Sequence, residues 1–244
     1  MIVDFEYQPL LEDFYSNSEL KIESILKIFE NSGSQHSDAA GDKILEGSAN
    51  GKTWVLTDWY VEIDSFPKYG DKIVAKTWSQ GATSLFGTSR DFELYSNQKL
   101  CARGTTRWVL FDFNSGRPAK VEKELLEKYG PENKFAFTNS EFNQSKLPKI
   151  DLPESFENEI KITPRRNDID FNNHVHNLVY MDYAMDAIPQ DIYKKHNFHK
   201  IRITYKVAVK AGEDLYVKYA KNGENHAVFI FGSDNSLKTM IEIS

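Results

Sequence analysis

Side chains that could carry out chemistry gather in one short stretch of the sequence. Asp168, Asp170, Asn172, His174 and His176 alternate with other residues and lead into a stretch of helical periodicity. A carboxylate, an amide and an imidazole held close together can move a proton and orient a water molecule. Acid–base catalysis is therefore one interpretation of this segment.

The same residues allow two other interpretations. Asp and Asn are preferred at helix N-termini, where their side chains accept hydrogen bonds from free backbone N–H groups. On residue pattern alone, such capping is favoured over catalysis. A zinc site built from His174, His176 and the two aspartates ranks third, because residues two apart on a helix point in nearly opposite directions.

Other catalytic patterns are missing from the sequence. It contains no Gly-x-Ser-x-Gly motif, which excludes the nucleophile turn of the α/β-hydrolases. Cys101 is the only cysteine and lies in an alternating apolar pattern, where a free cysteine is usually a small buried residue. One cysteine excludes an internal disulfide and is typical of a reducing compartment, for which the cytoplasm is the default.

Composition limits the class of protein. With 244 residues, 40% of them hydrophobic, the chain can form one large domain or two of about 100 residues each. A net charge of -6 argues against nonspecific nucleic-acid binding. We expect no membrane insertion, because no segment approaches the ~20 apolar residues that a membrane helix needs, and the first residues do not resemble a secretory signal.

Two helices are predicted from apolar residues at positions i, i+3, i+4 and i+7. The first, at about 18–31, carries the stripe Ile22, Ile25, Leu26 and Phe29. Ser16 and Glu19 resemble a capping box before it, and Gly33 is the expected end. The second carries the stripe Val175, Leu178, Val179 and Tyr183, and Pro189 is expected to end it.

Strands are predicted after each helix, in β-branched and aromatic runs separated by turn residues. They fall within 54–78, 88–95 and 100–113, with a hairpin at Ser96–Gln98, and then within 201–209, 215–220 and 227–231. Two short segments also repeat: 70–76 resembles 212–218, an offset of 142 residues, and 96–100 resembles 233–237, an offset of 137. A duplicated unit explains both matches.

The duplication predicts an α+β fold, a tandem (double) hotdog in which a long helix of each half is wrapped by an antiparallel sheet. Residues 131–155 contain Pro131, Pro148 and Pro153 among Asn and Ser, a composition typical of a connection. The predicted domains are an N-terminal hotdog at 1–130, a linker at 131–155 and a C-terminal hotdog at 156–244.

Asp170–Asn177, with Tyr180 after it, resembles the Asp-x-Asn-x-His-Val-x-Asn signature of acyl-acyl carrier protein thioesterases. The N-terminal half is similar to the same family in the order and spacing of 54–57, 61–63, Pro67, 70–71, 77–78, 90–92 and 108–112. The resemblance covers nearly the whole chain. It suggests a bacterial-type cytoplasmic member, because no transit-like segment precedes it.

This resemblance implies hydrolysis of a fatty acyl thioester on acyl carrier protein, without metal or cofactor. It implies a catalytic set of Asp170, Asn172 and His174. Asp170 would activate water or attack the carbonyl, His174 would share the proton, and Asn172 would orient the water or the carbonyl. We expect the backbone N–H groups near His174 and Val175, at a helix N-terminus, to bind the oxyanion.

One position departs from the family pattern. The strand after the second helix commonly carries a glutamate shortly before a glycine, and here Ala208 occupies the matching place. Either Asp170 suffices as the base, or Glu213 or Asp168 replaces the missing carboxylate, or activity is low.

The resemblance also implies where the substrate binds. The acyl chain would lie in the N-terminal half near three candidates, Ile25, Phe29 and Trp54. Because carrier protein is acidic, docking needs a local basic patch, for which Arg165 with Arg166, or Lys194 with Lys195, are the candidates. A homodimer is left open. The alternatives are an acyl-CoA thioesterase and a non-hydrolytic acyl-binding or dehydratase protein of the same fold.

Overall fold

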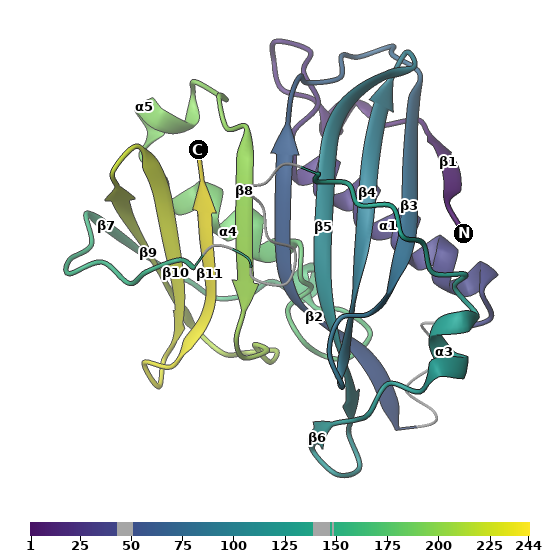
Figure 1. Ribbon diagram of the computed structural model, residues 1–244. Coiled ribbons are helices and arrows are strands. Elements are labelled where there is room, and N and C mark those ends of the chain that lie inside the picture. The colour runs from purple at the N-terminus through teal and green to yellow at the C-terminus, as the bar shows by residue number, and fades with distance from the viewer. Residues whose placement is uncertain (43–50, 139–146, 148) are drawn as a thin grey trace. The chain divides into compact units, whose positions relative to one another are not determined.

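The computed structural model describes residues 1–42, 51–138, 147 and 149–244. Its contacts divide the chain into two units, Met1–Leu147 and Pro148–Ser244. In each unit an α-helix packs against one face of an antiparallel sheet (Figure 1), which is the predicted α+β hotdog arrangement. Within the described residues no helix is long and apolar enough to cross a membrane.

The sheet of the first unit contains five main strands: β1 (Val3–Tyr7), β2 (Lys52–Ile63), β3 (Ile73–Ala82), β4 (Gly87–Ser96) and β5 (Lys99–Asp112). Their order is β1-β3-β4-β5-β2, and the short β6 (Arg117–Pro118) pairs with the end of β5. The predicted hairpin is confirmed: Asn97 and Gln98 form a two-residue turn with positive φ at both positions. Such turns match the twist of antiparallel strands.

The helix of this unit, α1 (Ile22–Ala39), buries the predicted stripe against the sheet. The predicted capping box is wrong, because the helix begins after Lys21 without a side-chain cap. Before α1 the chain forms the short helix η1 (Leu11–Asp13) and then reverses direction. Phe14 and Leu20 form an antiparallel β-bridge across this reversal. The predicted end at Gly33 is also wrong. A Cβ there would lie 3.2 Å from Arg90 Cδ, so this glycine serves close packing inside the helix.

Aromatic rings join α1 to the sheet. Phe29 stacks on Trp59 and Phe92, with ring centroids 6.4 and 5.1 Å away, and all three side chains are fully buried. Gly104 lies beneath the ring, where a Cβ would come within 3.0 Å of it. The sheet therefore has no side chain beneath the Phe29 ring.

The opposite face of this sheet is covered by chain that follows α3 (Lys123–Glu127). Within the predicted linker, residues 134–137 cross this face (Figure 1). Trp78 Nε1 donates to the Lys134 carbonyl at 2.7 Å, and Phe137 packs against Tyr60. The Ala136 N–H donates to the buried Asp91 carboxylate at 2.9 Å. Residues 139–146 and 148 of the same predicted linker lie outside the described residues.

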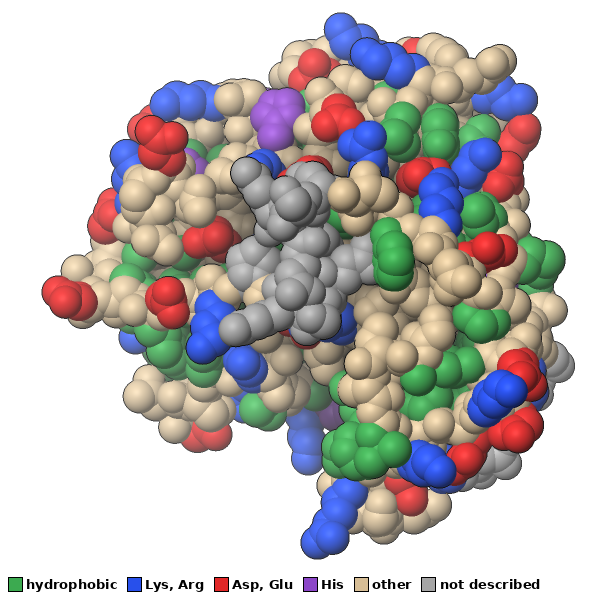
Figure 2. Space-filling model, viewed as in Figure 1, with side chains coloured by type: hydrophobic (Ala, Val, Ile, Leu, Met, Phe, Trp, Pro, Cys, Tyr) green, Lys and Arg blue, Asp and Glu red, His purple; other side chains and the backbone are tan. Residues whose placement is uncertain are grey.

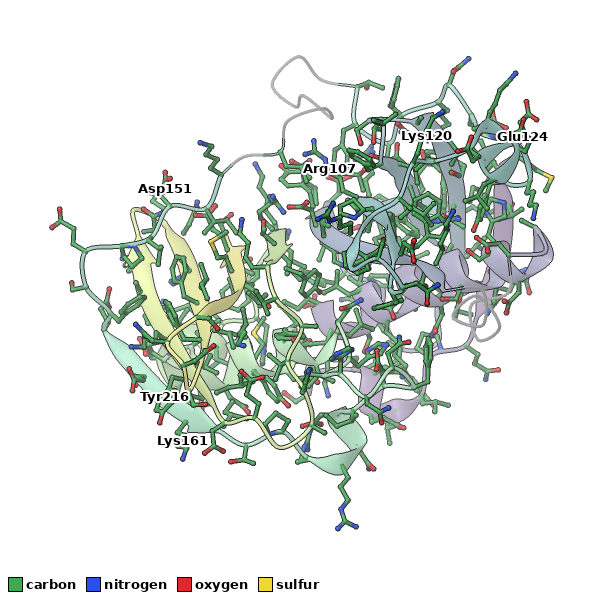
Figure 3. All side chains as sticks on the ribbon, turned by 90° about the horizontal axis from the view of Figure 1, so that it is seen from below. Arg107, Lys120, Glu124, Asp151, Lys161 and Tyr216 are labelled. Carbon is green, nitrogen blue, oxygen red and sulfur yellow. The ribbon has the colours of Figure 1, made fainter. Side chains whose placement is uncertain are left out.

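The second unit has its own sheet, with the strands β7 (Asn158–Ile162), β8 (Lys200–Tyr205), β9 (Leu215–Asn222), β10 (Asn225–Gly232) and β11 (Leu237–Ile243). Their order is β8-β11-β10-β9-β7, all antiparallel. Lys161 and Tyr216, opposite each other across β7 and β9, show this register in Figure 3. One face packs on α4 (Val179–Ala187), and Ile150 and Phe156 cover Phe229 and Met240 on this sheet.

The second helix is shorter than predicted. It begins at Val179, four residues after Val175, and ends at Ala187 before Pro189, as expected from the proline. A short helix, α5 (Gln190–Tyr193), follows. Val175 instead pairs with Ile169 in extended conformation, so the polar segment precedes the helix without entering it.

Candidate active site

Residues 170–174 form a tight loop between the paired Ile169 and Val175. The Asp170 N–H donates to the His174 carbonyl at 2.8 Å, and the Asn173 N–H donates to the Asp170 carbonyl at 3.1 Å. Asn173 closes the turn with φ of 61°, a conformation that asparagine tolerates better than most residues. The loop is therefore fixed by its own backbone.

The Asp170 side chain is held inside this loop. Its Oδ1 accepts the N–H groups of Asn172 at 2.8 Å and His174 at 3.1 Å. These two hydrogen bonds fix the orientation of the carboxylate. No donor in the described part of the chain occupies Oδ2, so one oxygen is left to accept a proton from substrate or water.

His174 and Asn172 complete the predicted catalytic set. The His174 side chain is half-buried and the Asn172 side chain is exposed. The imidazole forms no hydrogen bond with any residue that the structure describes. The loop thus contains one carboxylate held by backbone N–H groups, one imidazole and one amide, which are residue types that can transfer a proton and orient water.

Asp168 anchors the loop and is not exposed for chemistry. Only 2% of this residue is accessible. Arg165 forms an ion pair with it at 2.9 Å, and the Tyr183 hydroxyl donates to it at 2.7 Å. The Arg165 N–H also donates to this carboxylate, closing the turn of η3 (Arg166–Asp168). Burial raises the pKa of Asp168, but the hydrogen bonds from Arg165 and Tyr183 outweigh it and hold the pKa below its usual value.

A second segment lies beside the loop. The Val175 N–H donates to the Val209 carbonyl at 2.8 Å, and Lys210 pairs with His174 in a single β-bridge. The buried Tyr180 hydroxyl accepts the Val209 N–H at 3.2 Å. Burial raises the pKa of Tyr180 well above its usual value. Two tyrosines one turn apart on α4 therefore hold the two segments of the site, Tyr183 through Asp168 and Tyr180 through Val209.

The predicted oxyanion donors are wrong. The His174 N–H is bound to Asp170 and the Val175 N–H to Val209, so neither is free for a substrate oxygen. The helix N-terminus that was expected to present them begins later, at Val179.

Ala208 is exposed, as is most of its segment. Of its two predicted substitutes, Glu213 forms an ion pair at 2.6 Å with Lys238, an ammonium that is nearly fully buried. Removing Glu213 from this pair would leave a buried charge, which is costly. Asp168 is equally committed to Arg165 and Tyr183. Of these three carboxylates, Asp170 alone forms no ion pair with a residue that the structure describes.

The three predicted acyl-pocket residues separate into different environments. Ile25 and Phe29 are completely buried in the core between α1 and the sheet. Trp54 lies elsewhere in the unit, packed with Leu110, Val121 and Leu126, and its Nε1 donates to Asp42 at 3.2 Å.

The predicted docking residues also differ. Arg165 is committed to Asp168, whereas Arg166, Lys194 and Lys195 are exposed. The described residues contain no group of three or more His, Cys, Asp or Glu that could hold a metal ion.

Comparisons with known proteins agree with the fold and identify the family. The acyl-ACP (acyl carrier protein) thioesterase N-terminal domain model matches residues 3–129, and the C-terminal domain model matches residues 152–243. Oleoyl-acyl carrier protein thioesterase 1 of Arabidopsis thaliana is 30% identical over 206 residues, covering 78% of this chain and 56% of the relative. The dodecanoyl-[acyl-carrier-protein] hydrolase of Cinnamomum camphora is 28% identical, covering 66% and 43%.

The chain spans about half the length of the curated relatives that it matches. Among solved structures, the 12:0-ACP thioesterase from Umbellularia californica has a TM-score of 0.87 at 20% identity and covers 100% of this chain and 96% of its own. An acyl-ACP thioesterase from Bacteroides thetaiotaomicron has a TM-score of 0.86 at 18% identity, with 99% and 96% covered. These two structures share the fold in both units.

Proposed function

Because this chain belongs to the acyl-ACP thioesterase family, we propose that it hydrolyses a fatty acyl thioester on acyl carrier protein to the free fatty acid and the carrier. The observation that carries the proposal is the 170–174 loop. It fixes Asp170 through Oδ1, no donor among the described residues binds Oδ2, and the same loop carries His174 and Asn172.

The proposed reaction adds water to the thioester carbonyl. Asp170 Oδ2 accepts a proton from the attacking water, whose oxygen bonds to the carbonyl carbon. When the tetrahedral intermediate collapses, the carbon–sulfur bond breaks and the thiolate takes up a proton through His174. Little acid assistance is needed, because the pKa of a thiol is near ~8.5. Asn172 orients the water or the carbonyl through its amide.

Thiol release from acyl carrier protein loaded with a panel of acyl chains tests this proposal. We expect turnover by the wild type, and a loss of 10²-fold or more in kcat for both Asp170→Asn and His174→Ala. Asp191→Asn, an exposed carboxylate on α5, is the matched control and should keep full activity. If folded Asp170→Asn and His174→Ala both turn over at near wild-type rates, the assignment of these residues is wrong.

The same assay separates the alternative functions. Faster turnover of matched acyl-CoA would favour an acyl-CoA thioesterase. Uptake of the acyl chain without thiol release would favour an acyl-binding protein. Cell fractionation tests the cytoplasmic location, which is expected from the single cysteine. Light scattering tests whether the protein is a homodimer.

The acyl pocket in the first unit remains part of the proposal. Ile25 and Phe29 already fill core positions, so their replacement would change stability together with any binding. Trp54 is only half-buried, and it is the candidate through which pocket size can be changed with least damage to the core.

A further inference from the structure

An exposed ridge lies beside the catalytic loop. Residues 206–212, here called the lysine ridge, connect β8 to β9, and six of the seven are exposed. Only Val209 is buried, and it is held by Val175 and Tyr180. The N–H groups of Lys206 and Val207 both point to the Lys238 carbonyl, at 2.8 and 3.2 Å. The ridge is thus exposed and fixed in place at the same time.

The ridge reaches the reacting groups through Lys210, which pairs with His174. Paired residues in antiparallel strands have Cα atoms about 4.5–5.5 Å apart. A partner seated on the ridge therefore contacts protein within a few ångströms of the catalytic loop.

Two unpaired cations lie on this ridge. Neither Lys206 nor Lys210 forms an ion pair with a described residue, whereas three other lysines of this unit are paired: Lys161 with Asp214, Lys218 with Glu159 and Lys238 with Glu213. The face seen in Figure 2 carries interspersed positive and negative side chains. Free cations are notable in a chain of net charge -6.

Two exposed apolar side chains belong to the ridge and to the loop that pairs with it. Val207, between the two lysines in the sequence, is 49% exposed, and Phe171, in the loop whose His174 pairs with Lys210, is 57% exposed. Lysines beside exposed apolar residues suit a partner whose surface combines carboxylates with apolar side chains.

We infer that the lysine ridge, together with Phe171, is the docking surface for an acidic carrier protein. The inference rests on the proposed function, and it replaces Arg165 as a docking residue, because that guanidinium is committed to Asp168. Lys206 and Lys210 attract carboxylates of the carrier, while Val207 and Phe171 lose exposed apolar area on contact. The acyl thioester is thereby delivered at the side of the loop where His174 lies.

A charge-reversal pair tests the inference. Lys206→Glu with Lys210→Glu is compared with the wild type on three substrates with the same acyl chain: acyl carrier protein, acyl-CoA and the acyl thioester of N-acetylcysteamine. We expect kcat/KM on the carrier to fall at least 10-fold, with a twofold change or less on the other two substrates. In the wild type, added salt should weaken the carrier reaction more than in the variant.

Lys149→Glu with Lys221→Glu is the matched control, since it changes the net charge equally on exposed lysines of the same unit. Equal losses on all three substrates, or an equal loss in the control pair, would overturn the inference. A parallel loss on acyl-CoA would also overturn it, because it would indicate phosphate recognition in place of protein docking. If the reversal pair does not fold, Lys206→Ala with Lys210→Ala replaces it. We then expect a smaller loss of kcat/KM than for charge reversal, and only on the carrier substrate.

Failure of the proposed function gives a different result. In that case the wild type hydrolyses none of the three thioesters. Fluorescence anisotropy with labelled acyl carrier protein then tests the docking surface alone: weaker binding to the reversal pair than to the control pair supports it, and equal binding overturns it.

Discussion

Asp168 and Asp170 are the same residue type two positions apart, and their surroundings give them different tasks. Asp168 is buried and accepts hydrogen bonds from Arg165 and Tyr183, so it holds structure. Asp170 is half-buried, and no donor among the described residues binds its Oδ2. The sequence predicts a role for Asp170 from a local signature, and that role stays a prediction. It could not predict the role of Asp168, because one partner lies 15 residues away on α4.

Removing the Tyr183 hydroxyl should loosen this anchor. We expect Tyr183→Phe to lower the free energy of unfolding by about 1.5–3 kcal/mol near neutral pH, the range for a hydrogen bond to a charged group. The Asp168 pKa is lower in the folded protein than its usual 3.8. The contribution is therefore complete above pH 3.8 and is lost as the pH falls through the folded pKa.

Urea unfolding from pH 6 down to pH 3 measures this difference between variant and wild type. The difference in the free energy of unfolding should decrease as the pH approaches 3. Tyr216→Phe on β9 is the control, since its hydroxyl forms no hydrogen bond within the described part of the chain. A loss that stays constant with pH would show that the hydroxyl does not stabilise an ionised Asp168.

The backbone of Asn173 gives a second prediction at this scale. Its φ of 61° is strained for a β-branched residue and free of strain for glycine. Asn173→Val should cost about 1–3 kcal/mol locally and lower kcat by distorting the Asp170 hydrogen bonds. Asn173→Gly should keep most of the activity. The kcat on acyl-loaded carrier protein and the melting temperature are measured for both variants. Equal activity in the two would show that the positive φ at position 173 is not needed for turnover.

At the scale of elements, the sequence predicts the buried face of a helix better than its ends. The stripe of α1 was found correctly because apolar periodicity records which side is buried. Gly33 was misread as a helix end because a glycine that makes room for Arg90 looks the same in sequence as one that ends a helix. The start of α4 was misplaced because Val175 fits both the helical stripe and the extended pair with Ile169.

The approach of α1 to its sheet depends on Gly104. We expect Gly104→Ala to lower the free energy of unfolding by about 1–3 kcal/mol, because the added methyl would contact the Phe29 ring at 3.0 Å and Val61 at 3.4 Å in a core without space. Gly81→Ala, also in a strand but with no atom within 4 Å of its Cβ, is the matched control. Denaturant unfolding measures the loss of stability in both variants. An equal loss would mean that the need for glycine at position 104 comes from backbone freedom and not from packing.

At the scale of the whole molecule, the predicted linker is partly structural. Within residues 131–155, the composition is typical of a connection, yet residues 134–137 cover the sheet of the first unit and Ile150 packs on the sheet of the second. The tandem fold was predictable because duplication leaves matching segments at a regular offset. The packing of the connection was not, because Trp78 and Phe229 need partners that are distant in sequence.

A buried carboxylate beneath this covering segment makes the stability of the first unit depend on pH. Asp91 is fully buried beneath it, where its Oδ2 accepts the Ala136 N–H and the Gln80 amide. Burial raises the pKa of Asp91 to about 6, from an ordinary 3.8, against hydrogen bonds that lower it. Between these values the unfolded chain has released the proton that the folded protein still holds. The contribution of Asp91 to stability therefore decreases as the pH rises from 3.8 to about 6, by about 3 kcal/mol in total.

Asp91→Asn removes this titration while keeping an oxygen that can accept both hydrogen bonds. We expect the variant to gain stability over the wild type as the pH rises from 4 to 6, and the gain to stay constant above that range. Guanidinium unfolding at intervals across this range measures it, with Asp4→Asn, an exposed carboxylate on β1, as the control. A gain that is the same at pH 4 and pH 7 would show that Asp91 does not hold its proton in the folded protein, and that the segment 134–137 is fixed by Trp78 and Phe137 without any dependence on pH.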